Sequence, residues 1–131
     1  MMTAPCPEEF VMVALTNVIT LAIDRAREAA DGHYTRHLVR TGPLQQTVIA
    51  LREGVRLAEH ESEVPATIYI LYGAIRVDSA EPFVLESGYL HEMPAQRRSV
   101  EAISDTVLLL TAVPGPDSVE GEDSVHVLPP L

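Results

Sequence analysis

Two consecutive stretches decide the fold of this chain: GVRLAEHESEVPATIYILYG at residues 54–73 and GYLHEMPAQRRSVEA at residues 88–102. Each begins with a glycine, and a landmark residue follows after five intervening residues. The landmark is His60 in the first stretch and Pro94 in the second. This repeated layout predicts the two halves of one small β-barrel.

Short strands separated by turn residues are expected on both sides of these stretches, from residue 33 to residue 113. Before them, residues 7–30 predict one helix, since apolar residues recur at spacings of three and four and Gly32 is placed to end it. The expected fold is therefore an all-β barrel with one N-terminal α-helix. The helix stripe is Leu15, Val18, Ile19, Ala22, Ala26 and Ala29, and the strands are 33–41, 44–51, 55–60, 66–71, 74–78, 83–85, 89–93, 99–102 and 106–113.

The landmarks and the strands between them resemble a group of small single-domain cupins that carry an amino-terminal helix. The similarity covers roughly residues 17–113. It implies a double-stranded β-helix, also called a jelly-roll barrel, and commonly a homodimer. Members of this group are mostly described without a defined reaction, so the resemblance leaves the function open.

The metal-binding motifs of this family are degenerate here. Metal-binding cupins supply two histidines and a glutamate from the first motif and a third histidine from the second. In this chain those positions fall on His60, Ser62, Ala66 and Arg98, or on Ser99 one register along. Because a transition metal usually needs three or more converging donors, we expect no metal cofactor. The alternative is a divalent transition metal held by His60, with His91 as a replacement ligand.

Four residues are candidates for binding a ligand: His60, Ser62, His91 and Arg98. His60 is either a ligand or an imidazole that is hydrogen-bonded to a neighbour. Arg98 inside a pocket would hold a carboxylate or phosphate, whereas in an exposed turn it would be solvated. His91 is expected at the surface or at the edge of a pocket unless it replaces a metal ligand.

Two other residue pairs, one of histidines and one of tyrosines, give weaker evidence for a functional site. His33 and His37 fall about 13 Å apart along one expected strand, which disfavours a joint metal site. Tyr69 and Tyr72 are expected to pack rather than react. No catalytic residue is assigned.

These residues favour a non-catalytic cupin-domain protein that binds a small molecule, which is an anion if Arg98 lies in the pocket, or a protein partner. The alternative is a metal-dependent enzyme, such as an oxygenase, isomerase or epimerase, with rearranged ligands. A structural dimerisation module is a third interpretation, and it requires an interior filled by Ile68, Ile70, Leu108 and Leu110.

Composition limits the number of domains, the cellular compartment and the classes of partner. The 131 residues fit one domain, and Cys6 is the only cysteine, which suggests the reducing cytoplasm. A net charge of −10 argues against nucleic acid and against anionic membrane surfaces as partners. The most apolar run, residues 10–23, is too short and too polar to span a bilayer.

Two further expectations concern the ends of the chain. Residues 1–113 should form the helix and barrel. An acidic tail rich in proline and glycine should follow at 114–131. Within this tail, residues 124–128 could add a strand to an open sheet edge of the same or a neighbouring subunit. A homodimer is expected to bury apolar residues of the amino-terminal segment together with edge strands. Those residues are Val11, Met12, Val13, Leu15, Val18 and Ile19.

Overall fold

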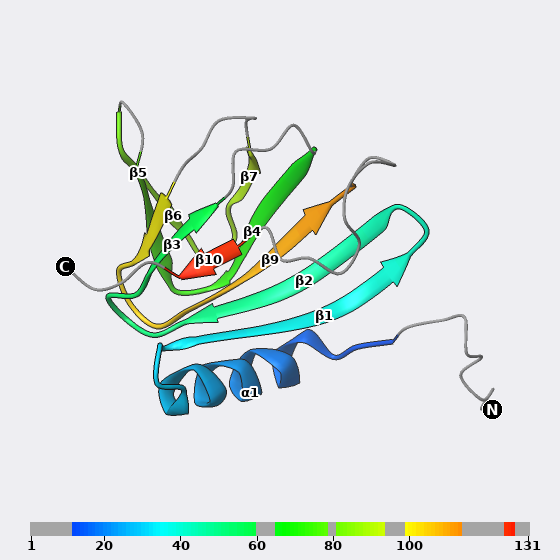
Figure 1. Cartoon of the computed structure of the whole chain (residues 1–131), viewed down its shortest axis with the longest axis horizontal. Helices are drawn as coiled ribbons and strands as arrows, with labels where there is room; N and C mark the ends of the chain where they lie inside the picture. The colour runs from blue at the N-terminus through cyan, green and yellow to red at the C-terminus, as the bar shows by residue number, and fades with distance from the viewer. Residues whose placement is uncertain (1–11, 60–64, 79–80, 94–98, 114–124, 128–131) are drawn as a thin grey trace.

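The computed structural model describes residues 12–59, 65–78, 81–93, 99–113 and 125–127. Within them, one helix precedes ten antiparallel strands that form two facing sheets (Figure 1). The elements are α1 (Leu15–Glu28), β1 (His33–Thr41), β2 (Leu44–Leu51), β3 (Arg56–Glu59), β4 (Ala66–Tyr72), β5 (Ala74–Asp78), β6 (Phe83–Glu86), β7 (Leu90–Met93), β8 (Ser99–Ala102), β9 (Thr106–Ala112) and β10 (Val125–Val127).

The strand order differs from the chain order in both sheets. Sheet A runs β1-β2-β9-β4-β7, and sheet B runs β10-β3-β8-β5-β6. The expected all-β fold with one N-terminal helix is confirmed. The division into a barrel at 1–113 and a tail at 114–131 stays a prediction, but the tail does supply β10, which pairs with β3 of the same chain.

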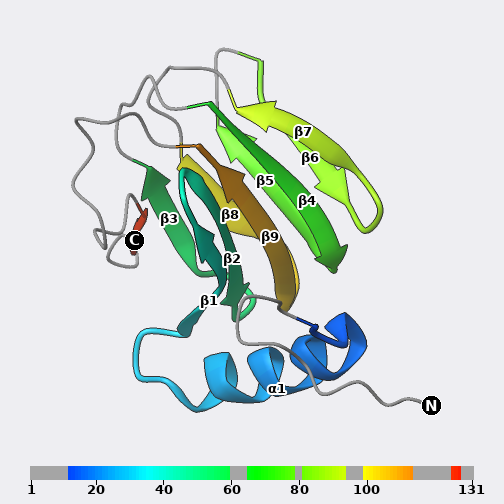
Figure 2. The same cartoon turned by 90° about the vertical axis from the view of Figure 1, so that its right-hand side faces the viewer.

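Helix α1 lies along β1 and β2 on the outer face of sheet A (Figure 2). Val18, Ala22 and Ala26 recur every fourth residue, so they share one face and are buried there. The two alanines allow a close approach of helix to sheet. No helix in the described residues is long and apolar enough to cross a membrane.

The helix ends earlier than the sequence predicted. It stops at Glu28, and Ala29 already has an extended backbone, so Gly32 does not end it. Arg52 explains this end, because its guanidinium Nη1 donates to the carbonyl oxygens of Arg27 and Ala29, both at 3.3 Å. These contacts satisfy carbonyls that have no partner inside the helix.

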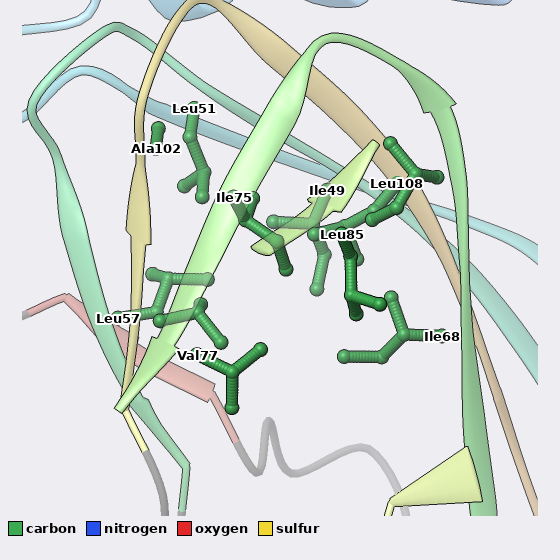
Figure 3. Close-up of a cluster of buried hydrophobic side chains, with 11 residues drawn as sticks. Ile49, Leu51, Leu57, Ile68, Ile75, Val77, Leu85, Ala102 and Leu108 are labelled. Atoms are coloured by element: carbon green, nitrogen blue, oxygen red, sulfur yellow. The ribbon is translucent and has the colours of Figure 1, made fainter. Parts of the chain in front are cut away.

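Strands β2 and β9 are buried on both faces. Their outer residues, including Val48 and Val107, pack against α1. Their inner residues join the barrel core, which both sheets line (Figure 3). The buried members of that core are Ile49, Leu51, Leu57, Ile68, Ile70, Ile75, Val77, Leu85, Val100, Ala102 and Leu108.

Candidate functional site

One lateral row of residues crosses all five strands of sheet A. In register order it contains His37, Thr47, Leu110, Ile68 and His91. Residues directly opposite one another in a sheet share a face, and Ile68 belongs to the barrel core, so the row lies on the inner face of the sheet. His37, on the edge strand β1, is nevertheless exposed. We call it the histidine row, because a histidine stands at each end.

His91 faces inward from β7 and is half-buried, with its Nε2 shielded from solvent. Its ring meets the edge of the Phe83 ring at a centroid separation of 5.1 Å and an interplanar angle of 66°. Phe83 lies on β6, so this contact joins the two sheets. His91 thus lies on the interior face of the edge strand β7, and its expected place at the edge of a pocket stays a prediction.

The sequence pattern of β7 hides this position. Leu90 is the branched aliphatic residue of the strand and would be assigned to the core on that ground, yet 67% of its surface is exposed. Its neighbour His91 takes the inner face instead. The register is set by pairing with β4, where Ile68 opposes His91 and Tyr69 opposes Leu90. Only the pairing of β7 with β4 shows that His91, and not Leu90, lies on the interior face.

The other end of the histidine row is polar and hydrogen-bonded. The His37 Nδ1 lies 3.0 Å from the Thr47 hydroxyl, and Thr47 is only 8% exposed. On the same face of β1, His33 Nε2 lies 2.8 Å from the Thr35 hydroxyl. The two histidines lie on one strand as expected, but sequence reasoning missed their threonine partners. A threonine amid the buried aliphatic residues of β2 was the available signal.

The level beneath the histidine row is aliphatic. There, Ile49, Leu108 and Ile70 oppose one another on β2, β9 and β4, and all three are buried. Ile68 and the partly buried Leu110 of the histidine row pack in the same core. The histidine row thus borders an apolar floor, and Ile68, Ile70, Leu108 and Leu110 all contribute to the packed interior, as the interpretation as a structural module requires.

The structure limits which motif positions carry donors into the barrel. Ser99, one of the two candidates for the last histidine position, donates its hydroxyl to Asp78 at 2.8 Å. It precedes the inward-facing Val100 and lies on the outer face of sheet B. Ala66, at the glutamate position, is on the inner face but has no donor.

Three predicted site residues, His60, Ser62 and Arg98, lie outside the described residues. Within the described part of the chain, no group of three or more histidine, cysteine, aspartate or glutamate side chains is placed to hold a metal ion. His91 would supply one imidazole. The described donor set alone therefore does not fit a transition-metal centre, and a site made with His60 stays a prediction.

No protein-family model and no curated protein matches this chain. Solved structures do match. A conserved protein of unknown function from Streptococcus pyogenes is 27% identical with a TM-score of 0.59, over 69% of this chain and 80% of that one. A cupin superfamily protein from Desulfitobacterium hafniense is 15% identical with a TM-score of 0.64, over 84% of this chain and 95% of that one. The chain folds as a cupin.

The cupin fold includes enzymes as well as proteins without a known function. Ectoine synthase from P. lautus matches this cupin with a TM-score of 0.63 at 13% identity, over 76% of this chain and 78% of that one. At that identity the likeness concerns the fold alone. The function of this cupin must therefore be argued from its own side chains.

Proposed function

We propose that this cupin is a non-catalytic binding protein whose barrel holds a small carboxylate-bearing molecule. The inward position of His91, beside Phe83 and in one row with His37 and Thr47, is the observation that carries the proposal. An imidazole N–H of His91 can donate a hydrogen bond to a carboxylate, while the aliphatic floor and Phe83 offer apolar contact.

One sequence argument supports an anionic ligand. Arg98 takes the place of a motif histidine, and a guanidinium matches a carboxylate with two parallel hydrogen bonds. We propose that Arg98, with His60 and Ser62, completes the set of ligand contacts. We also propose that the protein functions in the cytoplasm. A lone cysteine, at position 6, is compatible with that reducing compartment.

The chemistry of the described side chains supports binding over catalysis. A metal-dependent cupin enzyme needs several donors that converge on one point, and the described residues bring one imidazole to this end of the histidine row. The His37 imidazole is engaged at 3.0 Å by a buried hydroxyl, four strands away across the sheet. Such an arrangement favours holding a ligand rather than activating one.

Calorimetry with a panel of small carboxylates and inorganic phosphate tests the proposal. The variants His91→Ala and Arg98→Ala should each weaken binding at least tenfold. Arg76→Ala is the matched control, because Arg76 is exposed on the outer face of sheet B and pairs there with Glu101. Binding should also weaken as salt rises if water reaches the charges. Affinity unchanged in both test variants would refute the proposed site.

Elemental analysis tests the alternative. If the purified protein carried close to one transition-metal ion per chain, and both His60→Ala and His91→Ala removed it, the metal-dependent enzyme would become the better hypothesis. Metal that both variants retain would point to adventitious binding.

A further inference from the structure

Strand β1 carries two exposed arginines, and a β-bulge lies between them. Regular alternation along HYTRHLVRT would place Arg36 and Arg40 on the same face of the sheet. The pairing of β1 with β2 instead shifts by one residue between His37 and Val39. The extra residue, Leu38, packs in the layer between α1 and the outer face of sheet A. Residues that follow the bulge therefore lie on the opposite face from the one that alternation gives.

The register shows on which face each arginine lies. Arg36 opposes Val48, which packs against α1, so Arg36 belongs to the outer face. Arg40 opposes Gln45, and Gln45 stands two residues before Thr47 of the histidine row on β2. Because the histidine row lies on the inner face, Gln45 and Arg40 lie there as well. The bulge thus places the second arginine on the inner face of sheet A.

Small side chains accompany Arg40 in its row across sheet A. From Gln45 the row continues to Ala112 on β9 and Ala66 on β4. It lies next to the histidine row, on the side away from the aliphatic floor, near the turn of the β1–β2 hairpin (Figure 1). Strands β9 and β4 therefore contribute only methyl groups beside Gln45 in this row. We call Arg40 and Gln45 together the arginine site.

The two side chains of the arginine site can hold one oxyanion between them. Residues that oppose one another directly in an antiparallel pair have Cβ atoms about 5 Å apart. A guanidinium offers five N–H donors in a planar fork, and a side-chain amide adds two more. The fork matches two oxygens of a carboxylate or a phosphate group. The donors of Arg40 and Gln45 thus suit a small anionic group.

The charge of Arg40 is available to such a group. Arg27 and Arg76 each form an ion pair with a carboxylate of the chain. Among the described residues, no carboxylate lies within ion-pair distance of Arg40, although the chain has 19 acidic and nine basic residues. Arg40 is also exposed, so an anion from solution can reach its guanidinium.

We propose that the arginine site binds the phosphate or carboxylate group of a small molecule. The bulge supports this assignment, because β-bulges often lie next to functional sites, where they re-aim a side chain. The site is distinct from the one proposed at His91, since four strand spacings, about 19 Å along the sheet, separate β1 from β7. The two proposals can therefore be tested separately. Neither requires the homodimer expected from the sequence, which stays a prediction.

Nuclear magnetic resonance on the full chain tests the arginine site residue by residue. Titration with inorganic phosphate or with acetate to about 20 mM, at constant ionic strength, covers affinities down to the millimolar range. At least one of the two anions should shift the Arg40 Nε and the Gln45 side-chain amide resonances in a saturable way. The anion that binds more tightly identifies the group that the site prefers.

Three variants separate this site from the rest of the surface and from the barrel. Arg40→Ala should weaken the binding, followed at the Gln45 amide, at least tenfold, because it removes charged hydrogen bonds. Arg40→Lys should retain only part of the affinity, since an ammonium lacks the planar fork. Arg36→Ala is the matched control, because it removes an exposed arginine from the outer face of the same strand. It should leave the affinity nearly unchanged.

The His91→Ala variant distinguishes the two proposed sites. It should leave the shifts of the Gln45 amide and their midpoint concentration unchanged. The absence of a saturable shift with either anion, equal losses in Arg40→Ala and Arg36→Ala, or binding that His91→Ala abolishes would each overturn the arginine site. Circular dichroism and thermal melting of each variant verify that it is folded.

Discussion

The backbone of Asp105 presses against Gly73, so the turn between β4 and β5 has no room for a side chain at residue 73. Gly73 has a φ of +89°, and a Cβ added there would meet the carbonyl oxygen of Asp105 and come within 2.7 Å of the Thr106 hydroxyl oxygen. That hydroxyl donates to the Ala74 carbonyl at 2.9 Å, which links β9 to the start of β5. The glycine thus joins the two sheets at the end of the barrel beneath the histidine row.

Gly73→Ala should be severely destabilising. Left-handed backbone strain and overlap with Asp105 and Thr106 together should lower the free energy of unfolding by about 3 kcal/mol or more. Gly54→Ala is the control, because Gly54 also has a φ of +89° but a Cβ there would meet nothing within 4 Å. It should cost about 1–2 kcal/mol from strain alone. Urea unfolding of both variants measures the difference, and equal losses would argue against steric overlap at Gly73.

Asp105 also makes the stability of the protein depend on pH. The pKa of its carboxyl group is lowered, first by a hydrogen bond from the backbone N–H of Glu53 at 2.9 Å and then by Arg27, whose Nε lies 2.7 Å away. A lowered pKa in the folded state stabilises the protein fully above the unfolded value of 3.8. That contribution is lost as the pH falls through the folded pKa.

Asp105→Asn should therefore lower the free energy of unfolding at pH 7 by about 1 kcal/mol, because it removes the charge and leaves one acceptor oxygen where two oxygens accept hydrogen bonds, while water screens the exposed Arg27. The deficit relative to wild type should shrink as the pH is lowered below about 4, where the wild-type carboxylate also becomes protonated. Thermal melts from pH 7 to pH 2 measure this. Glu86→Gln, at an exposed position of β6, is the control and should track wild type. A deficit that stays constant with pH would contradict the assigned role.

The contact between α1 and sheet A should not accept a larger side chain. Ala22 has no exposed surface and belongs to the layer between α1 and the sheet. Ala22→Leu should cost about 1–3 kcal/mol, because added methyl groups in a packed layer force side chains or backbone to shift. Ala30→Leu makes the same change at an exposed position and should be nearly neutral. Chemical denaturation compares the two, and a neutral Ala22→Leu would mean that the helix packs loosely.

Thr47→Val tests the polar end of the histidine row. The change keeps the volume of the side chain but removes the hydroxyl 3.0 Å from His37 Nδ1. It should lower the free energy of unfolding by about 1 kcal/mol and alter the nitrogen resonances of the His37 ring. Thr41→Val, at the exposed end of β1, is the control. Unchanged His37 resonances would rule out this hydrogen bond in solution.

Much of the fold was predictable because glycine and proline positions set the turns. The predicted bounds of β1, β2, β5 and β8 coincide with those of the structure. Strands β3 and β7 each begin one residue later than expected, at Arg56 and Leu90. In the case of β7, the Tyr89 N–H donates to the Glu86 carbonyl, so Tyr89 belongs to the turn.

The orientation of the site residues was harder to predict, since it depends on register between strands that are distant in the chain. Local alternation would turn Leu90 inward and His91 outward, but the pairing of β7 with β4 reverses this. Likewise, Tyr69 looks like a core residue between Ile68 and Ile70, yet alternation from those two buried neighbours sends it outward. Which outer residues stay exposed depends on how far α1 reaches across the sheet.

The central place of β9 in sheet A has a consequence for folding during synthesis. Strand β9 lies between β2 and β4, although about 55 residues separate β2 from β9 in the chain. A ribosome that has made α1, β1 and β2 has supplied one side of the sheet, but the strand that joins this side to β4 emerges only after β3 to β8. The apolar faces of the early elements must then wait for β9, which predicts slow closure of the barrel and a need for protection of these faces until β9 has been made.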